Sequence, residues 1–505
     1  MSRGRDDPLS RGDARGKLAE RLSFLMLLVV VVWMPLPLGS NRPWAWSLLE
    51  VAVVGGFGLA LLMSSACRDA TVQAVRSLRG ASVLFAAWLA FGLFQTLPLG
   101  DALVAYLAPG PAAIYRSGGI LTAGRPAAVA VDTGLAVDEW LKHLAWVVLF
   151  FWVLALVRSR RRLRVLALVL VGTGLFEAAY GLAVWLGGDS LGLWRPEWYG
   201  HHVVTGTFVN RNHFAAHIVM TFSVGLGLLL AELLRSRWIG AGYRQRVRDL
   251  AALLHGPRLL ALSGLAIMAL ALVLSTSRGG MLALLGALAL VSGLGAVWHR
   301  RGHAERRAFG VAMAVILAAV LWTGPATLLA RFDSIGSESE GRIDVWRDTG
   351  ALISSSPWFG VGGGNYRWSI TAFRTADLGG TWINHAHNDY LELLAEYGAV
   401  GGLLAGLPVL MVLGGVLLGF RRRRDPLVRG LLFGALTACL AFLLHAFVDF
   451  NFRIPANAGY FFVILAMGLA AARVDAAGVG SAMEPGSSRD AASRGSNPQK
   501  APRNR

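Results

Sequence analysis

The chain has 505 residues, of which 55% are hydrophobic and only 15% are charged, and its mean hydropathy is +0.53. A soluble protein of this length carries about 25% charged residues, so the composition argues against a water-soluble fold. The net charge of +18 comes from short basic clusters between apolar runs, with no aromatic-interleaved basic surface, which argues against a nucleic-acid partner. We therefore expect an all-α integral membrane protein.

Apolar runs recur along the chain, and each is long enough to cross a ~30 Å hydrocarbon core as a helix. We predict about twelve transmembrane helices, over residues 22–38, 44–64, 82–98, 139–157, 165–186, 213–234, 259–276, 279–298, 308–330, 390–420, 427–447 and 457–473. The segment 390–420 is too long for one simple crossing, and we expect it to begin as an interfacial helix. The membrane domain, 22–473, follows a basic N-terminus, 1–21, and precedes a tail, 474–505, whose composition predicts disorder.

Basic residues follow every second predicted span. The clusters comprise Arg68, Arg76 and Arg79, then Arg158 to Arg164, Arg235 to Arg248, Arg300 to Arg307, and Arg421 to Arg424. The positive-inside rule then places both termini in the cytoplasm and leaves a large periplasmic loop, 331–389, between the ninth and tenth helices. Cys67 and Cys439 fall in a cytoplasmic loop and a span, so we expect no disulfide.

Polar residues gather at the outer ends of the predicted spans. They occur in Gly206–His213, in the tight turn Ser275–Gly280, in the long loop around Arg342 and at its end in Asn384–Leu391, and at His445 with Asp449 and Asn451. Arginine presents five donors in a planar fork that suits phosphate oxygens. Arg211 and Arg278 on one face are therefore typical of a diphosphate clamp, although each could instead snorkel to lipid phosphates.

The histidines at the end of the long loop suggest a proton acceptor. Asp389 followed by Glu392 predicts a capping box at the start of the tenth helix. His387 would then lie just before a helix N-terminus, where the helix dipole disfavours imidazolium. A neutral imidazole there can take a proton from a hydroxyl as a general base. Alternatively these residues merely cap the helix.

A metal site is a weaker interpretation of the same loop. Zinc could bind His385 and His387 with Asp344 or Asp389, but no third ligand has a recognisable spacing, so we predict no metal. Glu50 and Glu177 lie within spans and are either transport residues or protonated or paired, and we favour the second interpretation. The tryptophans near span ends most simply form an interfacial belt, although stacking on sugars stays open. They are Trp44, Trp46, Trp140, Trp194, Trp198 and Trp382.

Several motifs, taken in their order along the chain, resemble those of a known family. The pattern His385-x-His387-Asn388-x-Tyr390-Leu391, continued by Leu394-x-Glu396-x-Gly398-x-x-Gly401, resembles the signature of the O-antigen ligase and Wzy polymerase superfamily. The upstream blocks that are similar to that family's are Gly206-x-Phe208-x-Asn210-x-Asn212, Ser277-Arg278-Gly279, and Gly341-Arg342-x-x-x-Trp346 with Pro357-x-x-Gly360-x-Gly362. The resemblance covers about residues 200–455, and before it only Pro35–Ser40 matches.

The resemblance implies a fold of the GT-C type in the bacterial inner membrane. Members transfer glycan, with inversion and without metal or nucleotide, from an undecaprenyl-diphosphate carrier to an acceptor hydroxyl. The family's essential histidine maps onto His387, with His385 as the alternative, and its essential arginines map onto Arg211 and Arg278. Further substrate-binding residues are expected at Asn210, Asn212, Arg342, His385, Asn388, Tyr390 and His445.

The leading prediction is an O-antigen ligase that needs no cofactor and acts at a periplasmic site. Its partners would be an undecaprenyl-diphosphate-linked glycan donor, a lipid A core acceptor and membrane lipids. The nearest alternative is a Wzy-type O-antigen or exopolysaccharide polymerase, whose acceptor is another carrier-linked unit. A transporter would require an inverted repeat and polar residues at the midplane, and neither is apparent. A scaffold would leave the outward clustering of arginine and histidine unexplained.

Overall fold

The computed structural model describes residues 8–117, 127–187, 203–235, 256–299, 303–323, 335–375 and 382–474. Every regular element in these ranges is a helix, which confirms the all-α prediction. The long helices are α1 (Pro8–Trp33), α2 (Pro43–Met63), α3 (Ser65–Ser77), α4 (Arg79–Gln95), α7 (Thr133–Leu156), α8 (Arg160–Gly187), α9 (Arg211–Arg235), α11 (Pro257–Leu274), α12 (Arg278–Trp298), α13 (His303–Thr323), α15 (Ile335–Ser355), α17 (Asp389–Arg422), α18 (Pro426–His445) and α19 (Pro455–Arg473). The shorter elements are η1 (Leu38–Ser40), α5 (Asp101–Leu107), α6 (Pro109–Ser117), α16 (Tyr366–Ser369), η4 (Ile370–Phe373) and η5 (Asn451–Arg453).

Each predicted span overlaps one of these helices. Eight of the described helices are long and apolar enough to cross a membrane, and nine if α3 and α4, which are bent by 95° at their junction, form one broken span. A multi-pass membrane protein is therefore confirmed, and the count of twelve stays a prediction.

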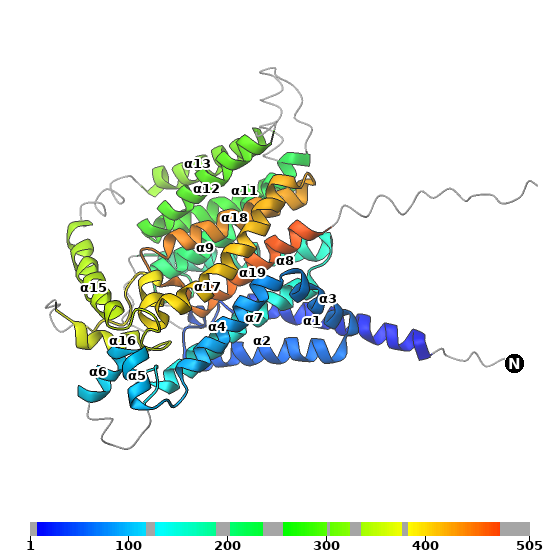
Figure 1. Cartoon of the computed structure of the whole chain (residues 1–505). Coiled ribbons are helices and arrows are strands. Elements are labelled where there is room, and N and C mark those ends of the chain that lie inside the picture. Colours follow the sequence, from blue (N-terminus) through cyan, green and yellow to red (C-terminus); the bar gives the residue numbers. More distant parts are fainter. Residues whose placement is uncertain are drawn as a thin grey trace, which may run out of the picture. The chain divides into compact units, whose positions relative to one another are not determined.

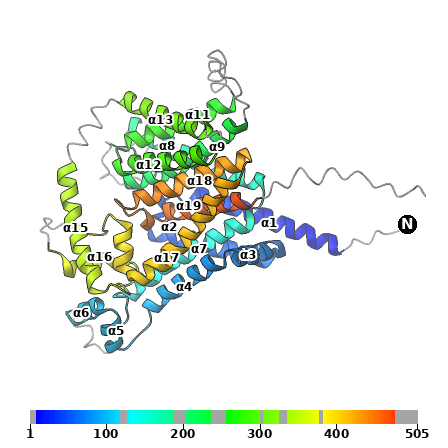
Figure 2. The ribbon, with the colours of Figure 1, turned by 45° about the horizontal axis from the view of Figure 1, so that its top comes forward.

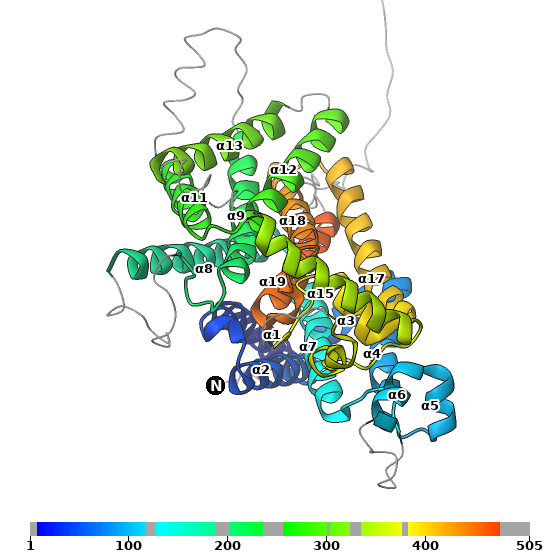
Figure 3. The ribbon, with the colours of Figure 1, turned by 90° about the vertical axis from the view of Figure 1, so that its left-hand side faces the viewer.

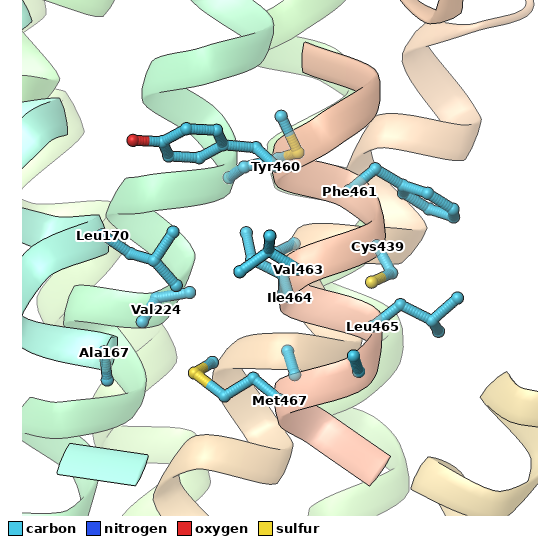
Figure 4. Packing of buried hydrophobic residues seen from close by; sticks show 14 of the residues in the cluster. Ala167, Leu170, Val224, Cys439, Tyr460, Phe461, Val463, Ile464, Leu465 and Met467 are labelled. Carbon is cyan, nitrogen blue, oxygen red and sulfur yellow. The ribbon is translucent and has the colours of Figure 1, made fainter. Parts of the chain in front are cut away.

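The centre of the described bundle is formed by α9, α18 and α19. At least 83% of the apolar window of each is buried, against 28% for α2, so α2 lies at the edge. Figure 4 shows side chains of α19, among them Tyr460 and Ile464, in the packed interior. The backbones of α9 and α18 approach closely: a Cβ added to Gly227 would lie only 2.4 Å from the Gly430 carbonyl oxygen. Small residues permit such close crossings in membrane helices.

The described members of the basic clusters lie together at one end of the bundle, whereas the arginines at 237–248 and 300–301 lie outside the described residues. Arg160 pairs with Asp425 at 3.0 Å, and Arg164 pairs with Glu232 at 3.4 Å. Arg158 and Arg162 both pair with Glu20, and Arg429 pairs with Glu305. Figure 1 shows α15 and α16 at the opposite end. That the clusters share one end agrees with the predicted topology, whereas the assignment of that end to the cytoplasm stays a prediction.

Much of the predicted long loop is helical. In Figure 3, α15 lies across the ends of several spans, and in Figure 2 α16 lies beside the first turns of α17. A small apolar core of its own holds this region together, formed by Leu352, Val361, Tyr366, Ile370, Ala386 and Ala395. The Trp346 indole donates to the Ala386 carbonyl at 2.8 Å, so α15 is attached directly to the histidine loop.

The long tenth segment is divided in two, which agrees with the expectation that it is more than one simple crossing. Gly398 inside α17 has φ +61° and ψ −172°, a conformation that is essentially restricted to glycine. At this break the backbone of α17 pairs with an earlier segment. The Val361 N–H donates to the Ala395 carbonyl at 3.0 Å, and the Ala399 N–H donates to the Pro357 carbonyl at 2.8 Å.

We expect Gly398→Ala to destabilise the protein by about 2 kcal/mol or more, because the strained φ is combined with a clash. The added Cβ would lie 2.3 Å from the Trp358 carbonyl oxygen. The control is Gly414→Ala in the same helix, where nothing lies within 4 Å of the added Cβ. Thermal melting of the purified proteins in detergent measures the difference, and equal melting temperatures would contradict the role assigned to the break.

Candidate functional site

A cavity of about 1340 Å³ opens at the end of the bundle that carries α15 and α16. This volume exceeds the 300–1,000 Å³ that is usual for small-molecule sites, so the cavity can hold an extended ligand. The first turns of α2, α7, α9 and α17 line it together with α15, η5 and the two segments 364–367 and 382–387.

The cavity brings together about half of the residues that the sequence predicts for the site. The predicted residues among its lining are Asn210, Arg211, Arg342, His385 and His387. The predicted residues outside this lining are Asn212, Arg278, Asn388, Tyr390 and His445. The site therefore comes from three chain regions, the starts of α9 and α15 and the loop before α17.

His387 is held at the cavity wall by a buried carboxylate. Its Nδ1 lies 3.4 Å from Oδ1 of Asp449, which is fully buried, whereas the His387 side chain is 39% exposed. His213 Nε2 lies 3.8 Å from the same oxygen. Burial alone would raise the pKa of Asp449, but the adjacent histidines hold it well below its usual range, so the carboxylate is ionised at neutral pH. An ionised carboxylate orients an imidazole and stabilises its protonated form.

The backbone at His387 has an unusual conformation. His387 has φ +50°, a left-handed conformation that is uncommon for a residue other than glycine. Such residues cluster at active sites, where the surrounding structure holds them in place. Thr276, just before Ser277 and Arg278, shares this feature with φ +55°.

The predicted capping box is wrong by one residue. The N-cap of α17 is Asn388, whose side chain accepts from the N–H groups of Tyr390 and Leu391 at 3.0 and 3.1 Å. The Asp389 carboxylate instead accepts from the Phe452 N–H, and Glu392 accepts from the Ala386 N–H at 3.0 Å. Because Asn388 already satisfies the first turn, Glu392 is available to hold the histidine loop. His387 still immediately precedes the helix cap, as predicted.

His385 is fixed by contacts different from those of His387. Its Nδ1 lies 2.9 Å from Glu392 Oε1, and its ring stacks on Phe450 at 4.0 Å. The His387 ring meets the same phenyl ring edge-on at 4.9 Å. Phe450 is thus a shared apolar wall for both histidines, and each imidazole has one carboxylate partner.

The floor of the cavity is an ion network around Arg453, a residue that the sequence analysis missed. Arg453 Nη1 lies 3.0 Å from Glu139 Oε1, and its Nε lies 3.1 Å from Glu392 Oε1. Glu396 is its third carboxylate partner. Burial alone would lower the pKa of Arg453, but the three carboxylates raise it, so the guanidinium stays charged. The sequence feature that could have identified Arg453 was its position as a basic residue shortly before the predicted span 457–473, at the outer end of that span.

Arg278 is not among the residues that line the cavity, but its neighbour Gly279 packs against the end of α18. A Cβ on its neighbour Gly279 would lie 3.0 Å from His445 Nε2 and 2.9 Å from a Val448 methyl group. Arg342 donates from Nη1 to the Val448 carbonyl at 3.3 Å. The segment between His445 and Asp449 therefore connects the start of α12 with Arg342 and His387.

Three predicted binding residues have structural contacts. Asn212 Oδ1 accepts from the Ser277 hydroxyl at 2.9 Å, which joins the start of α9 to the turn before Arg278. The Tyr390 hydroxyl donates to the Leu443 carbonyl at 2.7 Å, and the residue lines a second, largely apolar pocket of about 250 Å³. Asn388 is the helix cap. Their roles in binding substrate stay predictions.

Further basic side chains that the sequence analysis did not select line the cavity. They are Arg42, Lys142 and Arg367. Lys142 lies 4.4 Å from the centre of the Trp46 ring and 2.9 Å from Glu139 Oε2. Arg42 lies between the first two predicted spans, so its place in the topology was the signal that could have found it.

The buried carboxylates inside the predicted spans differ in their contacts. Glu177 accepts from both the N–H and the hydroxyl of Thr207 at 2.8 Å, so it is paired, as we favoured. Glu50 Oε1 has no hydrogen-bond partner among the described residues.

The zinc interpretation named Asp344 or Asp389 as a third ligand. The Asp344 carboxylate lies 2.8 Å from Arg347 Nη1. Within the described ranges, no group of three or more His, Cys, Asp or Glu is arranged to hold a metal ion.

Comparison with known proteins supports the predicted resemblance. A family model described as O-Antigen ligase (Wzy_C) matches residues 263–406, which confirms the resemblance to the O-antigen ligase and Wzy polymerase superfamily over that range. The matched range contains Arg278, Arg342 and both loop histidines, whereas Arg211 and Arg453 lie outside it. No curated protein matches the chain. The match supports a membrane enzyme of the ligase or polymerase type without separating the two.

We expect Arg453→Met to destabilise the protein by about 3–5 kcal/mol, because it leaves three buried carboxylates without their shared cation. Arg367→Met is the matched control, since Arg367 lines the same cavity but is exposed. Chemical or thermal unfolding of the detergent-solubilised proteins measures the difference. If both variants unfold like the wild type, the network is not a structural element.

Proposed function

We propose that this protein transfers polysaccharide from undecaprenyl diphosphate to a hydroxyl of the lipid A core, at a site on the periplasmic side of the inner membrane. This is the reaction of an O-antigen ligase. The observation that carries the proposal is one large cavity that combines His387, backed by the buried Asp449, with the cationic side chains of Arg211 and Arg342. The family match supports this class of reaction.

In the proposed reaction His387 is the general base. With Nδ1 directed to Asp449, Nε2 would accept the proton of the acceptor hydroxyl. The acceptor oxygen forms a bond to the anomeric carbon of the donor while the bond from that carbon to the diphosphate oxygen breaks. The electron pair leaves with undecaprenyl diphosphate, and the anomeric configuration inverts. No metal ion is needed, because the diphosphate is already a good leaving group.

The arginines would stabilise the negative charge that develops on the diphosphate. Arg211 and Arg342 are the strongest candidates, because both line the cavity that contains His387. Arg342 hydrogen-bonds to a neutral carbonyl, which leaves its charge uncompensated by that contact. Arg453 is less suited to the task, since three carboxylates already surround it. We keep Arg278 in the clamp as a proposal, with its side chain reaching the diphosphate from the start of α12.

Two other functions differ from this one in ways that can be measured. A polymerase would use the same donor and base but a second carrier-linked unit as acceptor. A transporter would need polar groups near the middle of the membrane. The cavity lies instead at one end of the described bundle, which favours group transfer over transport.

The test is transfer by the purified full-length protein in lipid nanodiscs, with a carrier-linked glycan as donor and each acceptor offered separately. We expect lipid A core to be capped with glycan, detected as a shift on gels. Growth of carrier-linked chains alone would identify a polymerase. Movement of carrier-linked sugar across liposomes without new glycosidic bonds would identify a transporter.

We further expect His387→Ala to lower the transfer rate about a hundredfold or more, because the general base is lost. Arg278→Ala should lower the transfer rate strongly. Arg347→Ala, on the exposed side of α15, is the control and should leave the rate unchanged. Full transfer by both His387→Ala and Arg278→Ala would refute the assignment.

Asp449→Asn should lower kcat about tenfold or more while leaving the KM for donor and acceptor nearly unchanged. The amide keeps the shape but loses the charge that orients His387 and stabilises its protonated form. Asp344→Asn, which removes a half-buried carboxylate that pairs with Arg347 and does not line the cavity, is the control. A KM effect of the same size as the kcat effect, or an unchanged kcat, would show that Asp449 does not act through His387.

A further inference from the structure

Two indole rings lie exposed beside the cavity mouth. Trp368 is 47% exposed and Trp382 is 50% exposed, and their ring centres lie 5.3 Å apart at an angle of 74°. Trp382 lines the cavity, and the Arg367 guanidinium lies 5.2 Å from the Trp368 ring. Exposed large apolar side chains are common in this chain, but a pair of indoles beside a polar cavity presents aromatic faces to a ligand that enters it.

Trp382 lies near the end of a predicted span and also lines the cavity. The sequence alone favoured an interfacial belt residue at this position and left stacking on a sugar open. Its position in the lining of the polar cavity favours the second interpretation. Trp358, which is 63% exposed and lies outside that lining, offers a direct comparison within the same region.

The neighbouring polar groups complete the chemistry of sugar recognition. A sugar ring presents an apolar C–H face, which stacks on an aromatic ring, and hydroxyls at its edge, which need hydrogen-bonding groups. Arg367 and Asn384 are exposed and line the same cavity, and they supply a guanidinium and an amide. Trp382 is five residues before His387, so the two Cα atoms are at most about 18 Å apart. A short oligosaccharide can span that distance.

We propose that Trp368 and Trp382, with Arg367 and Asn384, form a subsite that binds the glycan chain of a substrate while the reacting end of that chain lies at His387. The inference rests on the proposed function for the identity of the reaction. The bound chain could be the donor polysaccharide or the core oligosaccharide of the acceptor, which present the same chemistry to the indoles.

Direct binding tests the subsite without any transfer. Lipid-free O-antigen oligosaccharide and lipid-free core oligosaccharide are titrated separately into the full-length protein in nanodiscs by calorimetry. We expect one of them to bind, and Trp382→Ala to weaken that binding about three- to tenfold. Trp382→Phe should restore most of the affinity, and Trp358→Ala should have no effect. Which oligosaccharide binds identifies the source of the chain.

Transfer kinetics give the second readout. Trp382→Ala should raise the KM of the matching substrate by a similar factor with little change in kcat, because the indole is remote from the reacting bond. Absence of binding by both oligosaccharides, or equal affinity of Trp382→Ala and the wild type, overturns the subsite even if transfer is normal. Binding that depends on Trp382 in a protein without transfer activity would support the subsite and refute the proposed reaction.

Discussion

The guanidinium of Arg453 is the contact on which the geometry of the site depends. It joins η5 to carboxylates from α7 and from the first turns of α17, and all of these groups are largely removed from solvent. Buried charges are tolerated only when they are paired, so none of these three parts can move independently. Glu392 also accepts from the Ala386 N–H and contacts His385, so the network fixes the histidine loop as well.

The cavity therefore contains two kinds of positive charge. Arg453 and Lys142 lie against carboxylates, and their charge maintains the fold. Arg342 contacts a backbone carbonyl that does not offset its charge. A diphosphate that entered the cavity would be attracted to the start of α15, where Arg342 lies. In the proposed reaction, this division of charge would give the donor a preferred orientation.

The apolar helices could be predicted from the sequence because hydrophobic length is a local signal, and the division of α17 followed from the length of its segment. Arg453 and Asp449 could not be assigned roles in this way. The partner of Arg453 in α7, Glu139, lies 314 residues away in the chain, and a basic residue at the end of a span also resembles a membrane anchor. The cap of α17 was misplaced because Asn388 and Asp389 are both good N-cap residues, and only the tertiary contact of Asp389 with the Phe452 N–H separates them. For Trp382 the sequence could not separate a belt residue from one that stacks on a sugar, since tryptophan is common both at span ends and in sugar-binding cavities.

The partners of the two loop histidines favour His387 as the base. Glu392, which contacts His385, also contacts Arg453, so part of its charge is already compensated. The contacts of Asp449 in the described structure are histidines and a backbone N–H, with no arginine or lysine among them. An imidazolium that forms during transfer would therefore be stabilised more strongly beside Asp449 than beside Glu392. In the proposed reaction His387, with its left-handed backbone and its exposed edge in the cavity, would be the histidine for which that stabilisation acts on the acceptor hydroxyl.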